Sequence, residues 1–132
     1  MSQFSVVNPS SGRVLRVFES HGDEHIQRML SDARCAQEKW RNTDFNYRAR
    51  ILSRFKTALL DNADALAMTL TNETGKPISQ ARGEIRATAT RVQYFLDECR
   101  AFLRPRVVGP LSFDAPNVAQ TEEWVTQHPL GV

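Results

Sequence analysis

The chain has 132 residues and a mass of 15.0 kDa, which fits one ordinary domain and leaves no room for two. Its 41% apolar and 24% charged residues exclude a disordered chain. No stretch approaches the roughly 18 uninterrupted apolar residues of a membrane-spanning helix, so we expect no membrane association. The 17 basic and 15 acidic residues are interleaved, and this balance argues against a nucleic-acid partner.

The N-terminal residues and the cysteines indicate the cellular compartment. The N-terminus has neither the basic nor the apolar region of a secretory signal. Two cysteines, Cys35 and Cys99, are too few for a disulfide scaffold or a four-ligand zinc site, so we expect a cytoplasmic protein. Neither cysteine has a nearby base, cation or helix N-terminus to stabilise a thiolate, and both are predicted to be non-catalytic.

The first twenty residues predict a strand pair. Val6 and Val7 lead into the turn-forming residues 8–12, and an apolar signal resumes over residues 14–18. A first helix is predicted to begin at Gly22-Asp23-Glu24, where acidic side chains suit the positive end of a helix dipole.

Three helical stretches follow from apolar residues spaced three and four apart. The first ends at Asn42-Thr43-Asp44, which also supplies a cap for the second. Poor helix formers at residues 61–64 predict that the second stretch, which continues to about residue 74, is two helices. Gly75 is predicted to be a left-handed C-cap, and the third stretch runs from Pro77 to Leu103, roughly 40 Å if unbroken.

The remainder of the sequence differs in character. Pro105 ends the last helix, and residues 118–127 alternate as in an amphipathic strand. The sequence stops inside the apolar run Leu130-Gly131-Val132 with no polar tail, so we expect a chain that has been cut.

Histidines and arginines are the remaining candidates for chemistry. His21 and His25 flank Gly22, and solvent-facing side chains are favoured over a metal pair because no third ligand is near. Two arginine clusters are interpreted as solvated helix faces with Glu84 and Asp61 as partners. The alternative is a cationic patch beside a substrate entrance or a partner surface. These clusters comprise Arg48, Arg50 and Arg54, and Arg82 and Arg86.

Five short motifs, in order along nearly the whole chain, resemble the N-terminal part of the NAD(P)-dependent aldehyde dehydrogenase superfamily. They are Val7-Asn8-Pro9-Ser10-Ser11-Gly12, Trp40 with Arg48, Arg50 and Leu52, Glu73-Thr74-Gly75-Lys76-Pro77, Gly83-Glu84-Ile85, and His128-Pro129-Leu130-Gly131-Val132. The resemblance implies an α/β parent fold, of which this segment is mainly α, with an N-terminal strand pair, long helices and a C-terminal oligomerisation strand.

The resemblance also implies a division of the segment. Residues 1–105 would form the strand pair and helices that pack on the NAD-binding domain. Residues 106–132 would form a loop and the oligomerisation strand, at about 118–128, and the chain would stop before the nucleotide-binding sheet. A homo-oligomer is therefore expected.

The implied reaction oxidises an aldehyde to a carboxylic acid with NAD or NADP. In the family a cysteine thiolate attacks the aldehyde, hydride passes to the nicotinamide, and a glutamate activates the hydrolytic water. The matching residues and the cofactor site would lie beyond Val132, so this segment contributes no catalytic or cofactor-binding residue and is expected to be inactive alone.

Two minor sites follow from the resemblance. A structural monovalent cation would be held by the backbone carbonyls of Val6 and Val7 and by Glu73; the alternative for Glu73 is an ordinary last-turn helix residue. Hard cations prefer such oxygen ligands.

The first turns of the helix after Pro77 would line a substrate entrance, which points to Glu84, Ala87 and Thr88. Arg86 and Arg91 would favour an anionic semialdehyde there, with surface ion pairs as the alternative.

A rival interpretation from a different class remains open at this point. The chain could be a complete helical module without enzymatic activity that binds a partner through groove packing or strand addition. In either case, apolar stripes shaped to pack on absent domains predict self-association of the isolated chain.

Overall fold

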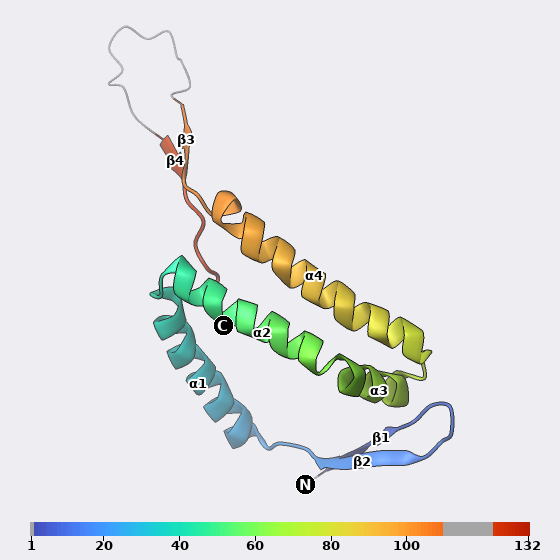
Figure 1. Ribbon diagram of the computed structural model, residues 1–132. Coiled ribbons are helices and arrows are strands. Elements are labelled where there is room, and N and C mark those ends of the chain that lie inside the picture. The colour runs from blue at the N-terminus through green and yellow to red at the C-terminus, as the bar shows by residue number, and fades with distance from the viewer. Residues whose placement is uncertain (1, 110–122) are drawn as a thin grey trace, which may run out of the picture.

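The computed structural model describes residues 2–109 and 123–132 (Figure 1). A β-hairpin precedes four helices, and a second two-stranded ribbon follows them. The elements are β1 (Gln3–Val7), β2 (Val14–Glu19), α1 (Asp23–Arg41), α2 (Phe45–Asp61), α3 (Ala63–Thr74), α4 (Ile78–Phe102), β3 (Arg106–Val108) and β4 (Glu123–Val125).

The hairpin is antiparallel and closes through a side-chain-stabilised turn. The Asn8 side-chain oxygen accepts hydrogen bonds from the backbone N–H groups of Ser10 and Ser11, at 2.9 and 3.1 Å, as Asn does in turns. Phe4 pairs with Phe18 across the strands, and their rings stack at 5.4 Å. The predicted strand pair is therefore confirmed.

Helices α1 and α2 begin and end where the sequence indicates. Acidic side chains occupy the first turn of α1, where they suit the helix dipole. The α2 N-cap is Asp44, whose carboxylate accepts a hydrogen bond from the Tyr47 backbone N–H at 2.9 Å. A one-residue break at Asn62 separates α2 from α3, as predicted from the poor helix formers there.

The Asp44 cap makes helix stability depend on pH. The hydrogen bond from the Tyr47 N–H, with weaker help from Arg50 and Arg48, lowers the pKa of Asp44 below its ordinary value of 3.8. A lowered pKa in the folded chain stabilises the fold above pH 3.8, and this contribution disappears as the pH falls through the folded value.

We therefore expect the thermal midpoint, followed by circular dichroism, to fall on acidification below pH 3.8 more in the natural chain than in Asp44→Asn. Asparagine is an equally good N-cap that does not titrate. Identical acid profiles for the two proteins would contradict this role of the carboxylate.

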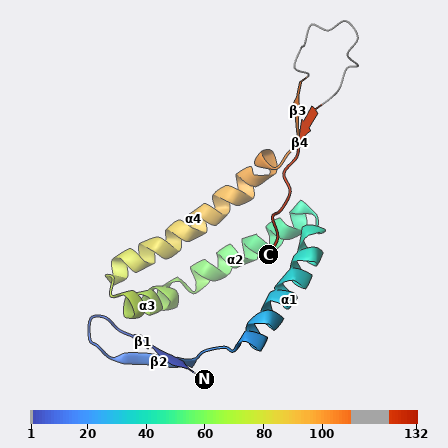
Figure 2. The same ribbon diagram turned by 180° about the vertical axis from the view of Figure 1, so that it is seen from behind.

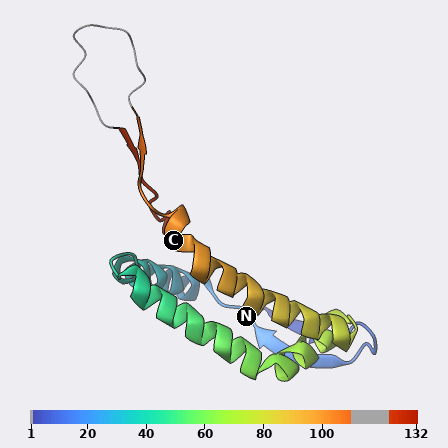
Figure 3. The same cartoon turned by 45° about the horizontal axis from the view of Figure 1, so that its top comes forward.

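Helix α4 is the longest helix of the described chain and contacts both α2 and α3. It runs along α2 and α3, which follow one another on its flank (Figure 3). The seam is made of small side chains: Ala67 of α3 and Ala81 and Ala89 of α4 are the buried apolar residues of the described chain. No large side chain within residues 2–109 and 123–132 is fully buried.

The molecule consequently exposes far more surface than a compact domain. Its accessible area is 11034 Å², against about 7,000 Å² for a compact monomer of 15.0 kDa. Helix α1 diverges from α2 in the front and back views (Figures 1 and 2), and Ile26 and Met29 of its apolar stripe are 50% and 54% exposed. The described part of the chain therefore leaves large apolar side chains exposed that its own elements do not cover.

The C-terminal part was only partly anticipated. Strand β3 was not predicted, because three residues directly after Pro105 are too few to show a period. It pairs antiparallel with β4, with Val107 opposite Trp124. The expected strand at about 118–128 is realised at Glu123–Val125, residues 126–128 are not in a strand, and residues 118–122 lie outside the described part.

Within the described residues, each helix is too short or too polar to cross a bilayer.

Candidate functional site

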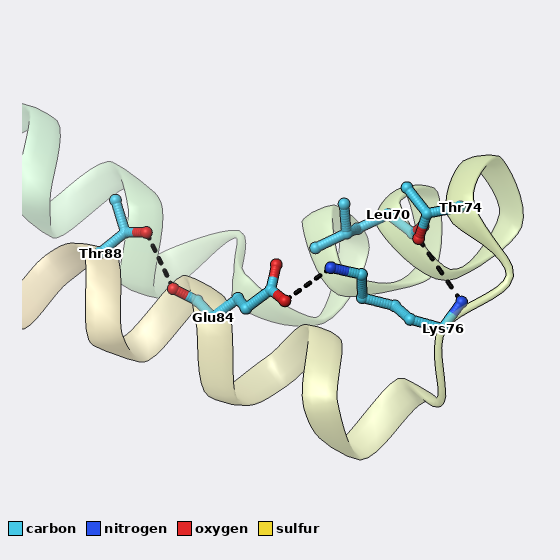
Figure 4. Close-up of polar contacts among 5 residues, drawn as sticks. All are labelled: Leu70, Thr74, Lys76, Glu84 and Thr88. Atoms are coloured by element: carbon cyan, nitrogen blue, oxygen red, sulfur yellow. Dashed lines mark hydrogen bonds and ion pairs between the residues drawn. The ribbon is translucent and has the colours of Figure 1, made fainter.

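The turn between α3 and α4 gathers most of the residues singled out in the sequence. Gly75 closes α3 in the left-handed conformation with φ 75°, as predicted, and its N–H donates to the Thr71 carbonyl. The Thr74 hydroxyl donates to the Leu70 carbonyl at 2.7 Å. Its oxygen accepts a hydrogen bond from the Lys76 backbone N–H at 3.5 Å (Figure 4). Pro77 is the N-cap of α4, which begins one residue later, at Ile78.

Lys76 and Glu84 form an ion pair across this turn. The Lys76 ammonium lies 2.6 Å from a Glu84 carboxylate oxygen (Figure 4). The Lys76 side chain is 26% exposed and that of Glu84 is 54% exposed. The pair is thus partly screened by water, and its main consequence is to neutralise the one acidic residue among the three predicted at the substrate entrance.

The other two entrance residues offer little polar chemistry. The Thr88 hydroxyl donates to the Glu84 backbone carbonyl at 2.8 Å (Figure 4), which is the usual fate of a threonine within a helix. Ala87 is exposed and contributes only a methyl group. All three lie on α4 within five residues, so the structure keeps them on one stretch of helix surface.

The hairpin turn packs against the same place. A Cβ atom built on Gly75 would lie 2.9 Å from Cγ of Pro9 and 3.4 Å from Oγ of Ser10. The side chains of the turn after Val7 therefore lie close to the backbone after Glu73, although the two segments are far apart in the sequence.

This contact bears on the expected cation site. The donors foreseen there, two carbonyl oxygens and a carboxylate, have the chemistry that a hard cation prefers. Val6 is half-buried and Glu73 is exposed. Among residues 2–109 and 123–132, Glu73 takes part in no ion pair, and no group of three His, Cys, Asp or Glu side chains gathers as a metal site.

The two histidines near the start of α1 lie close together, whereas the two cysteines lie on different helices. The rings of His21 and His25 stack with centroids 4.1 Å apart, a proximity that the intervening Gly22 concealed in the sequence. Cys35 is exposed on α1, as expected for its polar face, and Cys99 is half-buried in the stripe of α4 that packs on the other helices.

The arginine partners differ from those expected. Arg82 pairs with Asp64 at 2.8 Å, and not with Asp61. Glu84 pairs with Lys76, and not with an arginine. Asp61 takes part in no ion pair of the described chain. Arg48 donates to the Thr43 carbonyl at 2.9 Å.

Sequence reasoning also missed the polar bridges between α2 and α4. Lys56 of α2 donates to the Gln93 side-chain oxygen of α4 at 2.5 Å, and Arg100 of α4 donates to the Asn46 side-chain oxygen of α2 at 2.5 Å. Such bridges join residues far apart in the sequence, and no spacing rule signals them.

Comparison with known proteins identifies the family. The model of the aldehyde dehydrogenase family matches residues 1–132. The chain is 33% identical over 129 residues to 3-sulfolactaldehyde dehydrogenase of Pseudomonas putida. It is 31% identical over 130 residues to a probable NADP(+) succinate-semialdehyde dehydrogenase of Sinorhizobium fredii. Each match covers 98% of this chain and 25% of the relative.

A solved structure shows the same relationship. The crystal structure of succinate-semialdehyde dehydrogenase from Burkholderia pseudomallei superposes with a TM-score of 0.75 at 30% identity, over 84% of this chain and 23% of that one. The chain therefore spans about a quarter of the length of the proteins that it matches. The motifs, the fold and the family match over residues 1–132 agree. The chain belongs to the aldehyde dehydrogenase family and corresponds to an N-terminal portion of its members.

Proposed function

We propose that this chain is the N-terminal layer of an NAD(P)-dependent enzyme that oxidises an aldehyde to a carboxylic acid. The observation that supports this most is the family match over residues 1–132, which also favours this function over a stand-alone interaction module. In this proposal, residues 1–105 cover the dinucleotide-binding domain and residues 106–132 belong to the oligomerisation element of a cytoplasmic homo-oligomer. The exposed apolar faces of α1 and of the hairpin are consistent with such a covering role.

A semialdehyde is the favoured substrate class. The Sinorhizobium fredii and Burkholderia pseudomallei proteins are named for succinate semialdehyde. Lys76, in the turn before α4, offsets the negative charge of Glu84 on that helix. Arg91, seven residues after Glu84 and therefore on the same face of α4, is exposed without an ion pair in the described chain. Arg86 is also exposed, but it lies about 200° around the helix from Glu84 and does not add to this face. The helix surface of Glu84, Ala87 and Thr88 is thus left with a positive balance that would attract an anionic aldehyde.

A monovalent cation is proposed at the contact of the hairpin turn with the α3–α4 turn. The carbonyl oxygens of Val6 and Val7 and the carboxylate of Glu73 would hold it. The cation would have a structural role there, because it would hold together oxygen ligands from two segments that are distant in the sequence.

The test of the proposed function is a chimera. The isolated 132-residue chain, mixed with NAD or NADP and a panel of aldehydes, is expected to produce no reduced cofactor, because it supplies neither the nucleophile nor the cofactor site. Replacing the matching segment of the Sinorhizobium fredii relative with this chain is expected to give an enzyme that forms NADPH from succinate semialdehyde.

The relative without its N-terminal quarter serves as the matched control and should be inactive. A folded but inactive chimera would count against the proposal. So would steady cofactor reduction that follows the isolated chain through purification.

A further inference from the structure

We propose that a small arginine-lined cavity at one end of the helical layer binds the phosphate group of a small molecule. The cavity has a volume of about 280 Å³ and lies where the start of α2 meets the end of α4. It is lined by Phe45, Arg48, Arg100, Leu103 and Arg104. This site is separate from the α3–α4 turn, and the inference does not depend on the proposed oxidation of aldehydes.

Two of the three guanidinium groups are already held in place. Arg100 lies over the Phe45 ring at 4.6 Å and donates to the Asn46 side-chain oxygen at 2.5 Å. Arg48 is half-buried and donates to the Thr43 carbonyl at 2.9 Å. Holding a side chain in position before binding reduces the entropy lost when a ligand arrives. Each of these contacts uses only part of the five donors of a guanidinium group.

The three arginines have no carboxylate partner. Among residues 2–109 and 123–132, none of Arg48, Arg100 and Arg104 lies within ion-pair distance of an acidic side chain. This separates them from Arg82, which Asp64 neutralises at 2.8 Å.

The local charge balance indicates a doubly charged anion. Asp44 caps α2 close to Arg48 and subtracts one charge. The start of α2 and the end of α4 contribute about +0.5 and −0.5 and cancel. Three arginines and one aspartate therefore leave about two positive charges around the cavity. Phosphate carries close to two negative charges near neutral pH and matches the planar donors of arginine.

The volume indicates the size of the ligand. Pockets for drug-sized ligands are about 300 Å³ or larger, so this cavity alone suits a phosphate with few further atoms. Arg48 and Leu103 also line an adjoining cavity of about 500 Å³ together with Trp40 and His128. A phosphate ester could therefore place its phosphate among the arginines and its organic part beside the Trp40 ring.

Equilibrium dialysis of the 132-residue chain at low micromolar concentration tests this inference, with inorganic phosphate and phenyl phosphate as probes and phosphorus analysis as the readout. We expect saturable binding of both, and Arg100→Gln or Arg104→Gln should weaken it at least ~10-fold. Arg82→Gln is the matched control on the same helix and should leave binding unchanged within about 2-fold, because its partner is Asp64. Tighter binding of phenyl phosphate than of phosphate would identify the ligand as an ester, and equal binding would identify it as the free ion.

Three results would overturn the proposal: no saturable binding of either probe, equal loss in the Arg82→Gln control, or displacement of phosphate by an equal concentration of malonate. The last would show a site for any dianion. Circular dichroism verifies the helix content of each variant, and Arg104→Gln decides the question if Arg100→Gln does not fold.

Discussion

Replacing Gly75 with alanine is expected to lower the stability of the segment and to release the hairpin from the helical layer. Gly75 has φ 75°, where any residue with a Cβ is strained by about 1–2 kcal/mol. The added Cβ would also lie 2.9 Å from Cγ of Pro9, a ring atom that cannot rotate away. The hairpin must shift, so the total cost exceeds the backbone strain alone. The thermal midpoint measured by circular dichroism should fall accordingly.

Substitutions at two other glycines distinguish the cost of the contact with Pro9 from the cost of the left-handed backbone conformation. Gly12 has φ 69° but open space around its would-be Cβ, so Gly12→Ala should carry only the backbone strain. Gly83 lies inside α4 with no atom within 4 Å of its would-be Cβ, and Gly83→Ala should raise stability by about 0.5–1 kcal/mol. If Gly75→Ala were no worse than Gly12→Ala, the contact with Pro9 would have no energetic weight.

The isolated chain is expected to self-associate, and this is the second large effect. Its accessible area is about half again that of a compact monomer of the same mass. The excess includes large apolar side chains, such as Phe55 of α2 and Phe95 of α4, which are 50% and 53% exposed. Burial of such surface stabilises an assembly by about 25 cal/mol per Å². Light scattering over a dilution series should show particle mass rising with concentration.

Variants on α1 locate the responsible surface. Ile26→Gln combined with Met29→Gln removes two half-exposed apolar side chains from one stripe and should reduce association with little loss of helix. Arg28→Gln, between them in the sequence but off the stripe, is the matched control. A natural chain that stays monomeric at high concentration would contradict the interpretation of these faces as surfaces made to be covered.

The features that the sequence predicted correctly are those encoded by neighbouring residues. Asp44 caps α2 because a side-chain oxygen can reach an N–H three residues away. Gly75 ends α3 because only glycine adopts φ 75° without strain. The stripe of α4, with Ile85 and Ala89, faces its neighbours because a period of 3.6 aligns them.

The features that the sequence did not predict depend on residues brought together in space. Lys76 reaches Glu84 only because the chain reverses at the turn and α4 then advances two helical turns. Strand β3 exists because the predicted strand β4 pairs with it, and the three residues of β3 are too few to show a period. The cation and entrance residues remain proposals for the same reason: their roles depend on groups that meet only in a complete assembly.

The alanine seam along α4 reverses the usual pattern of mutational tolerance. In most domains the positions that least tolerate change hold leucine, phenylalanine or another bulky residue. In this layer the positions filled on all sides hold Ala67, Ala81 and Ala89, so even one added methyl group would force the helix axes apart. Within the segment alone, sensitivity to substitution should therefore be highest at its smallest side chains.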